Sequence, residues 1–107
     1  MKILLDECLP VDFRHSIPGH EVHSAEWAGL KGRTNGELLK SAEAAGYQVL
    51  LTADQGLAYQ NNLSNRSIAV LAIRSKTNQL EDLIPLVDSI LTALEGIRVG
   101  EVRRVAE

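Results

Sequence analysis

Acidic residues stand where two short apolar runs of the chain end. Asp6 and Glu7 directly follow the first run, Asp54 follows a later one, and Glu37 lies in the first turn of an expected helix. Carboxylates that converge on one place raise one another's pKa, and a bound divalent cation relieves that repulsion. Ligation by oxygen alone favours Mg²⁺ or Mn²⁺, which also accept substrate phosphates as ligands. The residue types therefore predict a metal site formed by Asp6, Glu37 and Asp54, with Glu7 as a further candidate ligand.

Each of these acids also has a simpler explanation. An aspartate after a strand is most often a turn former, and Glu37 near a helix start favours the helix dipole. Glu7 follows Asp6 directly, and neighbouring side chains on an extended backbone point in opposite directions. Only the convergence of Asp6, Glu37 and Asp54 on one crevice distinguishes a site from separate structural acids.

Apolar runs separated by helix-length segments predict a parallel α/β sheet with right-handed connections. The expected strands are Lys2–Leu5, His20–Ser24, Val49–Leu51, Ile68–Ile73 and an edge strand over Val99–Val105.

Capping and breaking residues predict the helices. One begins at Pro10 and stops before Pro18. A second is capped by Asn35 and closed by Gly46. A third starts at a capping box formed by Asn78 and Glu81, passes Pro85 in its first turns or with a kink, and ends near Gly96.

These elements predict one domain over residues 1–107, a three-layer α/β/α fold with four or five parallel strands in the order 2-1-3-4(-5). In such sheets ligands bind beyond the carboxyl ends of the strands, at the gap between strands 1 and 3. Asp6 and Asp54 emerge at that gap. Glu37 begins a helix at the same end of the sheet, because a crossover helix starts where its strand ends.

The charge distribution adds a candidate polymer-binding surface. The chain of 107 residues has a net charge of −3, yet Gln55–Leu80 contains no acidic residue and is rich in amides. Arg74 and Lys76 follow the fourth strand at the carboxyl end of the sheet, so they are the candidate phosphate contacts. Arg66 precedes that strand and is expected at the opposite end.

Composition narrows the class of protein. Apolar residues make up 45% of the chain and aromatic residues 4%, which provides an aliphatic core. No apolar run reaches the roughly 20 residues that span a bilayer, so no membrane contact is expected. One cysteine, Cys8, excludes an internal disulfide. After Met1 the chain enters a strand with no signal-peptide pattern, which favours a cytoplasmic protein.

Several motifs together resemble a known family. They are Asp6-Glu7-Cys8-Leu9-Pro10, Asn35-Gly36-Glu37-Leu38-Leu39, Leu50-Leu51-Thr52-Ala53-Asp54-Gln55 and Tyr59-Gln60-Asn61-Asn62-Leu63. They are similar to the compact PIN-like family that opens with an Asp-Glu-Asn-Leu-Pro-type motif. The resemblance covers nearly the whole chain, although Cys8 stands where that family usually has Asn. The candidates for a fourth acid at the metal site are Glu7, Asp82 and Asp88.

The resemblance implies a Mg²⁺- or Mn²⁺-dependent endoribonuclease with Asp6, Glu37 and Asp54 holding the metal. It also implies single-stranded or structured RNA as substrate, a role as the toxin of a toxin–antitoxin pair with an antitoxin protein as partner, and it allows a homodimer.

Two other functions stay open. In a receiver-like phosphoacceptor module Asp54 would take the phosphoryl group, but Glu37 would have no role and the last strand offers no lysine. A catalytically inactive domain of the same fold would bind only RNA or protein.

Three other features suggest weaker alternatives. His20 and His23 are three residues apart on a strand and face opposite sides, which argues against a zinc pair. Cys8 as a nucleophile would need a neighbouring general base, and no sequence motif indicates one. Trp27 either stacks on a base or plugs its loop onto the sheet.

Overall fold

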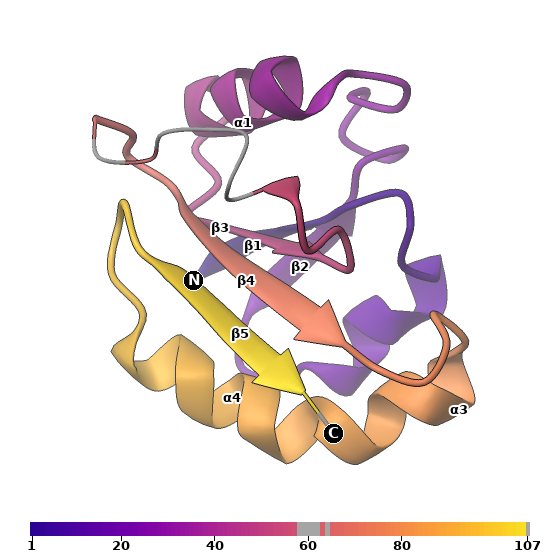
Figure 1. Ribbon diagram of the computed structural model, residues 1–107. Helices are drawn as coiled ribbons and strands as arrows, with labels where there is room; N and C mark the ends of the chain where they lie inside the picture. The colour runs from indigo at the N-terminus through magenta and orange to yellow at the C-terminus, as the bar shows by residue number, and fades with distance from the viewer. Residues whose placement is uncertain (58–62, 64, 107) are drawn as a thin grey trace.

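Five short parallel strands form one sheet in the computed structural model, which describes residues 1–57, 63 and 65–106 (Figure 1). They are β1 (Lys2–Leu5), β2 (Glu21–Ser24), β3 (Val49–Thr52), β4 (Ala69–Arg74) and β5 (Val102–Ala106). Their order is β2-β1-β3-β4-β5, and each neighbouring pair is parallel. The predicted α/β fold and strand order are confirmed, with the fifth strand present at an edge.

Successive side chains of each strand point to opposite faces of the sheet, so the apolar core has two layers. On β1, Ile3 and Leu5 pack into one apolar cluster, whereas Leu4 between them packs into the other. On β3, Leu50 likewise faces away from Leu51. Strands buried on both faces read as unbroken apolar runs, which explains why these segments were recognisable in the sequence.

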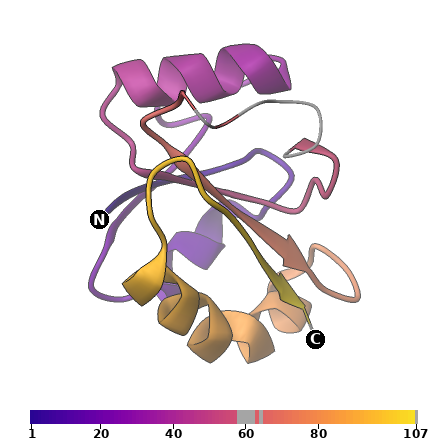
Figure 2. The same ribbon diagram turned by 60° about the vertical axis from the view of Figure 1, so that its left-hand side comes forward.

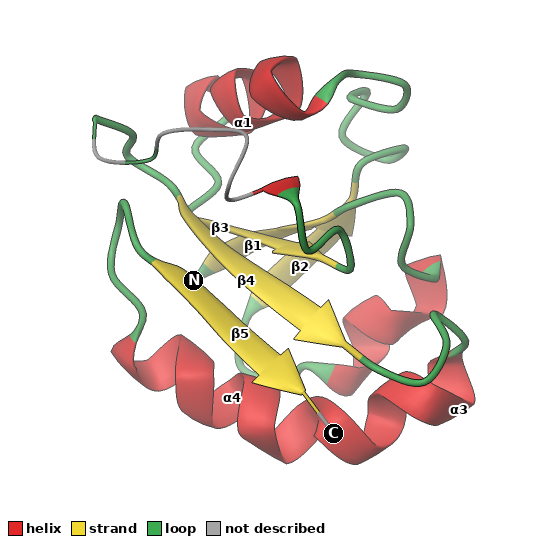
Figure 3. Cartoon of the chain, viewed as in Figure 1, coloured by secondary structure: helices red, strands yellow, loops and turns green. Residues whose placement is uncertain are grey.

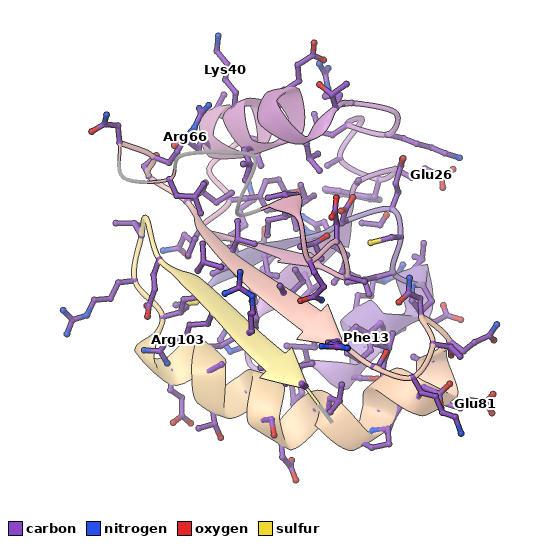
Figure 4. The ribbon with its side chains drawn as sticks, viewed as in Figure 1. Phe13, Glu26, Lys40, Arg66, Glu81 and Arg103 are labelled. Atoms are coloured by element: carbon purple, nitrogen blue, oxygen red, sulfur yellow. The ribbon has the colours of Figure 1, made fainter. Side chains whose placement is uncertain are left out.

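Helices cover both faces of this sheet (Figures 2 and 3). Their bounds are η1 (Val11–Ser16), α1 (Asn35–Ala44), α3 (Leu80–Leu83), η2 (Ile84–Leu86) and α4 (Val87–Gly96), η denoting a 3₁₀ helix. α1 covers one face, and the other helices cover the opposite face. η1 is held there by Phe13, which is fully buried and points into the core (Figure 4).

The N-terminal boundary of α1 differs from the prediction. Thr34 is the N-cap residue, and Asn35 is already the first helical residue. Because the Thr34 side chain makes no capping hydrogen bond, the start of α1 depends on packing instead. The predicted end is confirmed: Gly46 has φ +86°, and Tyr47 N donates to Ala42 O at 3.0 Å across the turn.

The predicted long helix over Asn78–Gly96 is broken. Its first turn begins after Gln79, and η2, which contains Pro85, separates α3 from α4. The capping box of Asn78 and Glu81 is wrong. The N-cap residue is Gln79, whose side chain forms no capping hydrogen bond. The Thr77 Oγ1 instead accepts from Gln79 N at 3.1 Å and donates to Asp82.

β5 begins at Val102, later than predicted, because a turn occupies the residues before it. Gly100 has φ +80°, and its N–H donates to Ile68 O at 2.9 Å, which fixes the start of the pairing between β4 and β5. Among the described residues, no helix is long and apolar enough to cross a membrane.

Candidate site at the carboxyl end of β1 and β3

The Thr52 hydroxyl joins the loops that follow β1 and β3. It donates to Asp6 Oδ2 at 2.7 Å and accepts from the backbone N–H of Asp54 at 3.0 Å. Thr52 is completely buried, and Asp6 is 9% exposed. This arrangement follows from the register: Leu5 pairs with Leu51, so the residues after them lie side by side. Asp6 and the Asp54 backbone therefore meet at the predicted gap.

Backbone donors orient both acids. Asp6 Oδ1 accepts from Glu7 N at 2.8 Å, and Asp6 N donates to Leu51 O at 2.9 Å, continuing the sheet for one residue. Asp54 Oδ1 accepts from Gly56 N at 2.9 Å, which closes a tight turn after β3. Asp54 is exposed, so one acid is buried at the base of the site and the other faces solvent.

Cys8 contacts the same Thr52 hydroxyl. Its Sγ lies 3.8 Å from Thr52 Oγ1 and accepts from Ala53 N at 3.4 Å. Desolvation of the sulfur raises the pKa of the Cys8 thiol, and the charge of Asp6 raises it further. These effects disfavour the thiolate that a cysteine nucleophile requires. Cys8 is a structural contact between the two loops in this arrangement.

The other two predicted acids lie apart from this pair. Glu7 is exposed, and its Oε2 accepts from Gly32 N at 3.0 Å, in the loop before α1. Glu37 is exposed in the first turn of α1, the helix that follows β2 along the chain. Among the described residues, no three His, Cys, Asp or Glu side chains form a group that could hold a metal. The structure thus brings Asp6 and the Asp54 loop together, and it does not bring Glu37 into a group with them.

The two other candidates for a fourth acid, Asp82 and Asp88, also form no described hydrogen bond with Asp6 or Asp54. Asp82 accepts from Thr77 Oγ1 in the loop before α3. Asp88, in the first turn of α4, lines a separate groove beside β5 with Ser89 and Arg104.

The basic residues divide between the two ends of the sheet. Arg74 ends β4 and Lys76 follows it, and both are exposed at the carboxyl end. Arg66 lies before β4 and forms an ion pair with Glu43 of α1 at 2.8 Å. This placement agrees with the expectation that Arg66 lies far from the acids.

Thr52 is the residue of this site that the sequence analysis missed. Its role cannot be read from its place after the predicted strand Val49–Leu51, because that role depends on the register between β1 and β3. The available signal was a hydroxyl residue standing at the end of an apolar run, two positions before Asp54. The motif over Tyr59–Asn62 lies outside the described residues.

No protein-family model, curated protein or solved structure matches the chain.

Proposed function

We propose that this protein is a metal-dependent endoribonuclease of the PIN-like class, acting as the toxin of a toxin–antitoxin pair in the cytoplasm. The observation that carries the proposal is the hydrogen-bonded connection from Asp6 through Thr52 to the Asp54 backbone. It lies at the gap between β1 and β3 where α/β sheets bind ligands. The resemblance of the motifs around Asp6, Glu37 and Asp54 to that class supports the same assignment.

The carboxylate oxygens of Asp6 and Asp54 are the type of ligand that Mg²⁺ and Mn²⁺ prefer. The Asp6 carboxylate accepts from Glu7 N and Thr52 Oγ1, and the Cys8 thiol also hydrogen-bonds to it. Because an ionised carboxylate has about four acceptor sites, these three contacts do not fill it. Mg²⁺ sites commonly use one or two carboxylates, with waters and phosphates completing the shell. Asp6 and Asp54 would hold the ion, with waters completing its shell, since Glu37 forms no group with them among the described residues.

Such an ion supplies an activated water and charge stabilisation for phosphodiester hydrolysis. The residues of the chain position the substrate around it. Burial and two hydrogen bonds fix Asp6, while the exposed Asp54 faces the polymer. Arg74 and Lys76 provide positive charge for flanking phosphates at the same end of the sheet.

Metal linkage gives the first test. With Mn²⁺ at about 100 times its dissociation constant, the free energy of unfolding rises by about 2.7 kcal/mol, or on the order of 10 °C in melting temperature. Asp6→Asn should abolish most of this shift, whereas Asp88→Asn, which changes an exposed acid on α4, should retain it. No shift in chelator-stripped wild-type protein would contradict a metal site.

Cleavage of single-stranded RNA gives the second test. Wild-type protein with Mn²⁺ should cut the RNA, and Asp54→Asn or added EDTA should stop it. If RNA is bound but not cut, the chain is an inactive binding domain. Stable phosphorylation of Asp54 by a small-molecule phosphodonor would instead identify a receiver-like module.

A further inference from the structure

Trp27 is the most exposed of the large hydrophobic residues described, with 71% of its surface accessible. It lies in the loop after β2, which is an edge strand of the sheet. Single exposed apolar residues are common on protein surfaces, so exposure alone identifies no site. The neighbours of Trp27 distinguish it from an ordinary surface residue.

Contacts within the protein hold the Trp27 indole in place without a ligand. Its ring lies 4.0 Å from the His23 ring, centroid to centroid, at an interplanar angle of 33°. His23 is itself fixed, because its Nδ1 lies 2.9 Å from the hydroxyl of the buried Tyr47. The backbone N–H of Trp27 donates to Ser24 Oγ at 3.1 Å, which fixes the loop. A preorganised ring loses less entropy on binding than a mobile one.

A hollow of about 280 Å³ adjoins this indole, lined by Arg14, Val22, His23, Ser24 and Trp27. It combines ring surface with one cation. Arg14 comes from η1 and is exposed, and no described residue forms an ion pair with its guanidinium. Stacking rings beside a basic side chain are the usual means of binding single-stranded nucleic acid.

The hollow is lined by residues of β2, which is the neighbour of the strand that ends before Asp6. β2 is parallel to β1 with Ser24 opposite Leu5, and Ala25 N donates to Leu5 O at 2.9 Å. Asp6 is the next residue after Leu5. The loop carrying Trp27 therefore leaves the sheet beside Asp6, on the side toward which the strands run, where Figure 4 labels Glu26.

The geometry points to Trp27, with His23 and Arg14, as a stacking subsite for one unpaired nucleobase of a single-stranded RNA that crosses the acids. The Trp27 indole stacks on the base, and Arg14 contacts an adjacent phosphate. This assignment rests on the proposed function for the identity of the polymer. It makes the loop after β2 a determinant of substrate binding, separate from Asp6 and Asp54.

Trp27 is the only tryptophan of the chain, so its fluorescence reports on this site alone. A short oligouridine is titrated into the full chain in EDTA, and binding is followed by tryptophan emission and by the anisotropy of a dye on the RNA. The wild type should show quenching, and Trp27→Ala should bind roughly 5- to 150-fold more weakly by anisotropy. Trp27→Phe should recover part of the affinity. Ile84→Ala, which shortens another exposed apolar residue on η2, should bind like the wild type.

An abasic oligomer of the same length separates stacking from phosphate contacts. Wild type and Trp27→Ala should bind it equally weakly. Equal affinity of these two proteins for oligouridine, or RNA binding without quenching, would overturn the assignment. Emission that changes with protein concentration in the absence of RNA would overturn it too, because a second copy would then cover Trp27.

The same variants separate this inference from the proposed function. Base-dependent binding in EDTA without cleavage in Mn²⁺ would refute the nuclease and leave the subsite standing. Cleavage by Trp27→Ala with the KM and kcat of the wild type would refute the subsite and leave the nuclease standing.

Discussion

The Thr52 hydroxyl is the contact on which the candidate site depends most directly. Thr52→Val keeps the side-chain volume and removes the donor to Asp6 and the acceptor for Asp54 N. Since buried groups left without partners cost about 1–3 kcal/mol, the free energy of unfolding should fall by that amount in urea titrations. Thr52→Ser keeps the hydroxyl and loses only a methyl group, which costs about 1 kcal/mol. Stability of Thr52→Val equal to that of the wild type would show that this hydroxyl does not hold the two loops together.

The reactivity of Cys8 tests the electrostatics of the same site. Desolvation and the Asp6 charge raise the pKa of the Cys8 thiol above its ordinary value of 9.0. The thiolate therefore forms only at more alkaline pH, and alkylation by iodoacetamide at pH 7.5 should be slower than that of a free thiol. Asp6→Asn should shift the pH profile of alkylation toward lower pH, as measured by mass spectrometry. A profile with a midpoint below 9.0 in the wild type would contradict this environment.

At the scale of single residues, Asp6 and Asp54 could be predicted from the sequence because each follows an apolar strand that is buried on both faces. Thr52 could not, because a hydroxyl at a strand end becomes part of a site only through its neighbour in the sheet. Glu37 was placed correctly at the start of α1, but the distance between α1 and the sheet depends on packing, which periodicity does not give.

Among the elements, β1, β3 and β4 were predictable because they are central and mostly aliphatic. In the segment from Asn78 to Gly96, the interruption at Pro85 agrees with the kink that a proline favours, whereas the start of the first turn after Gln79 was not predicted. The predicted capping box of Asn78 and Glu81 is also wrong, because a neighbouring hydroxyl forms the local hydrogen bonds instead. The Thr77 hydroxyl, one residue earlier, lies where it can bond both Gln79 N and Asp82.

The contact of Glu43 on α1 with Ser67 and Arg66, in the turn before β4, should make the stability of the fold depend on pH. Desolvation alone would raise the pKa of Glu43, but hydrogen bonds from Ser67 and the Arg66 guanidinium outweigh it and leave the pKa lowered. A lowered folded-state pKa stabilises the fold above the ordinary value of 4.5, and this stabilisation is lost as pH falls through the folded value. Glu43→Gln should therefore cost about 1 kcal/mol at pH 7 and progressively less below pH 4.5.

Urea titrations between pH 3 and pH 7 measure this difference. Glu95→Gln is the matched control, since Glu95 is exposed near the end of α4 and has no described partner. It should change stability by less than about 0.5 kcal/mol. A cost for Glu43→Gln that stays constant over this pH range would mean that the carboxylate charge contributes nothing to the contact.

At the scale of the whole molecule, acidic, aromatic and basic side chains lie together at the carboxyl end of the parallel sheet. Asp6, Asp54, the loop of Trp27 and the pair Arg74 and Lys76 all follow carboxyl ends of strands. If the proposed function is right, this arrangement would present a cation site flanked by positive charge to the RNA. The opposite end of the sheet carries the Glu43–Arg66 pair, whose charges neutralise each other locally.

The proposed function predicts that RNA crosses this end of the sheet over Arg74 and Lys76, which are both exposed. Each phosphate contact to a single strand contributes roughly 0.7 to the slope of log affinity against log salt. Arg74→Ala combined with Lys76→Ala should therefore reduce that slope by roughly 1.4 at most and weaken binding at low salt. Mn²⁺ affinity should remain unchanged, because neither residue is a candidate ligand.

The matched control removes the same charge elsewhere. Lys40 lies on the outer surface of α1 (Figure 4), and Arg98 lies in the turn before β5, so neither follows the carboxyl end of a strand. Lys40→Ala combined with Arg98→Ala changes net charge equally and should leave the salt slope nearly intact. Equal slopes for both double variants would mean that RNA responds only to net charge. The polymer path over Arg74 and Lys76 would then be wrong, even if Asp6 and Asp54 bind the metal.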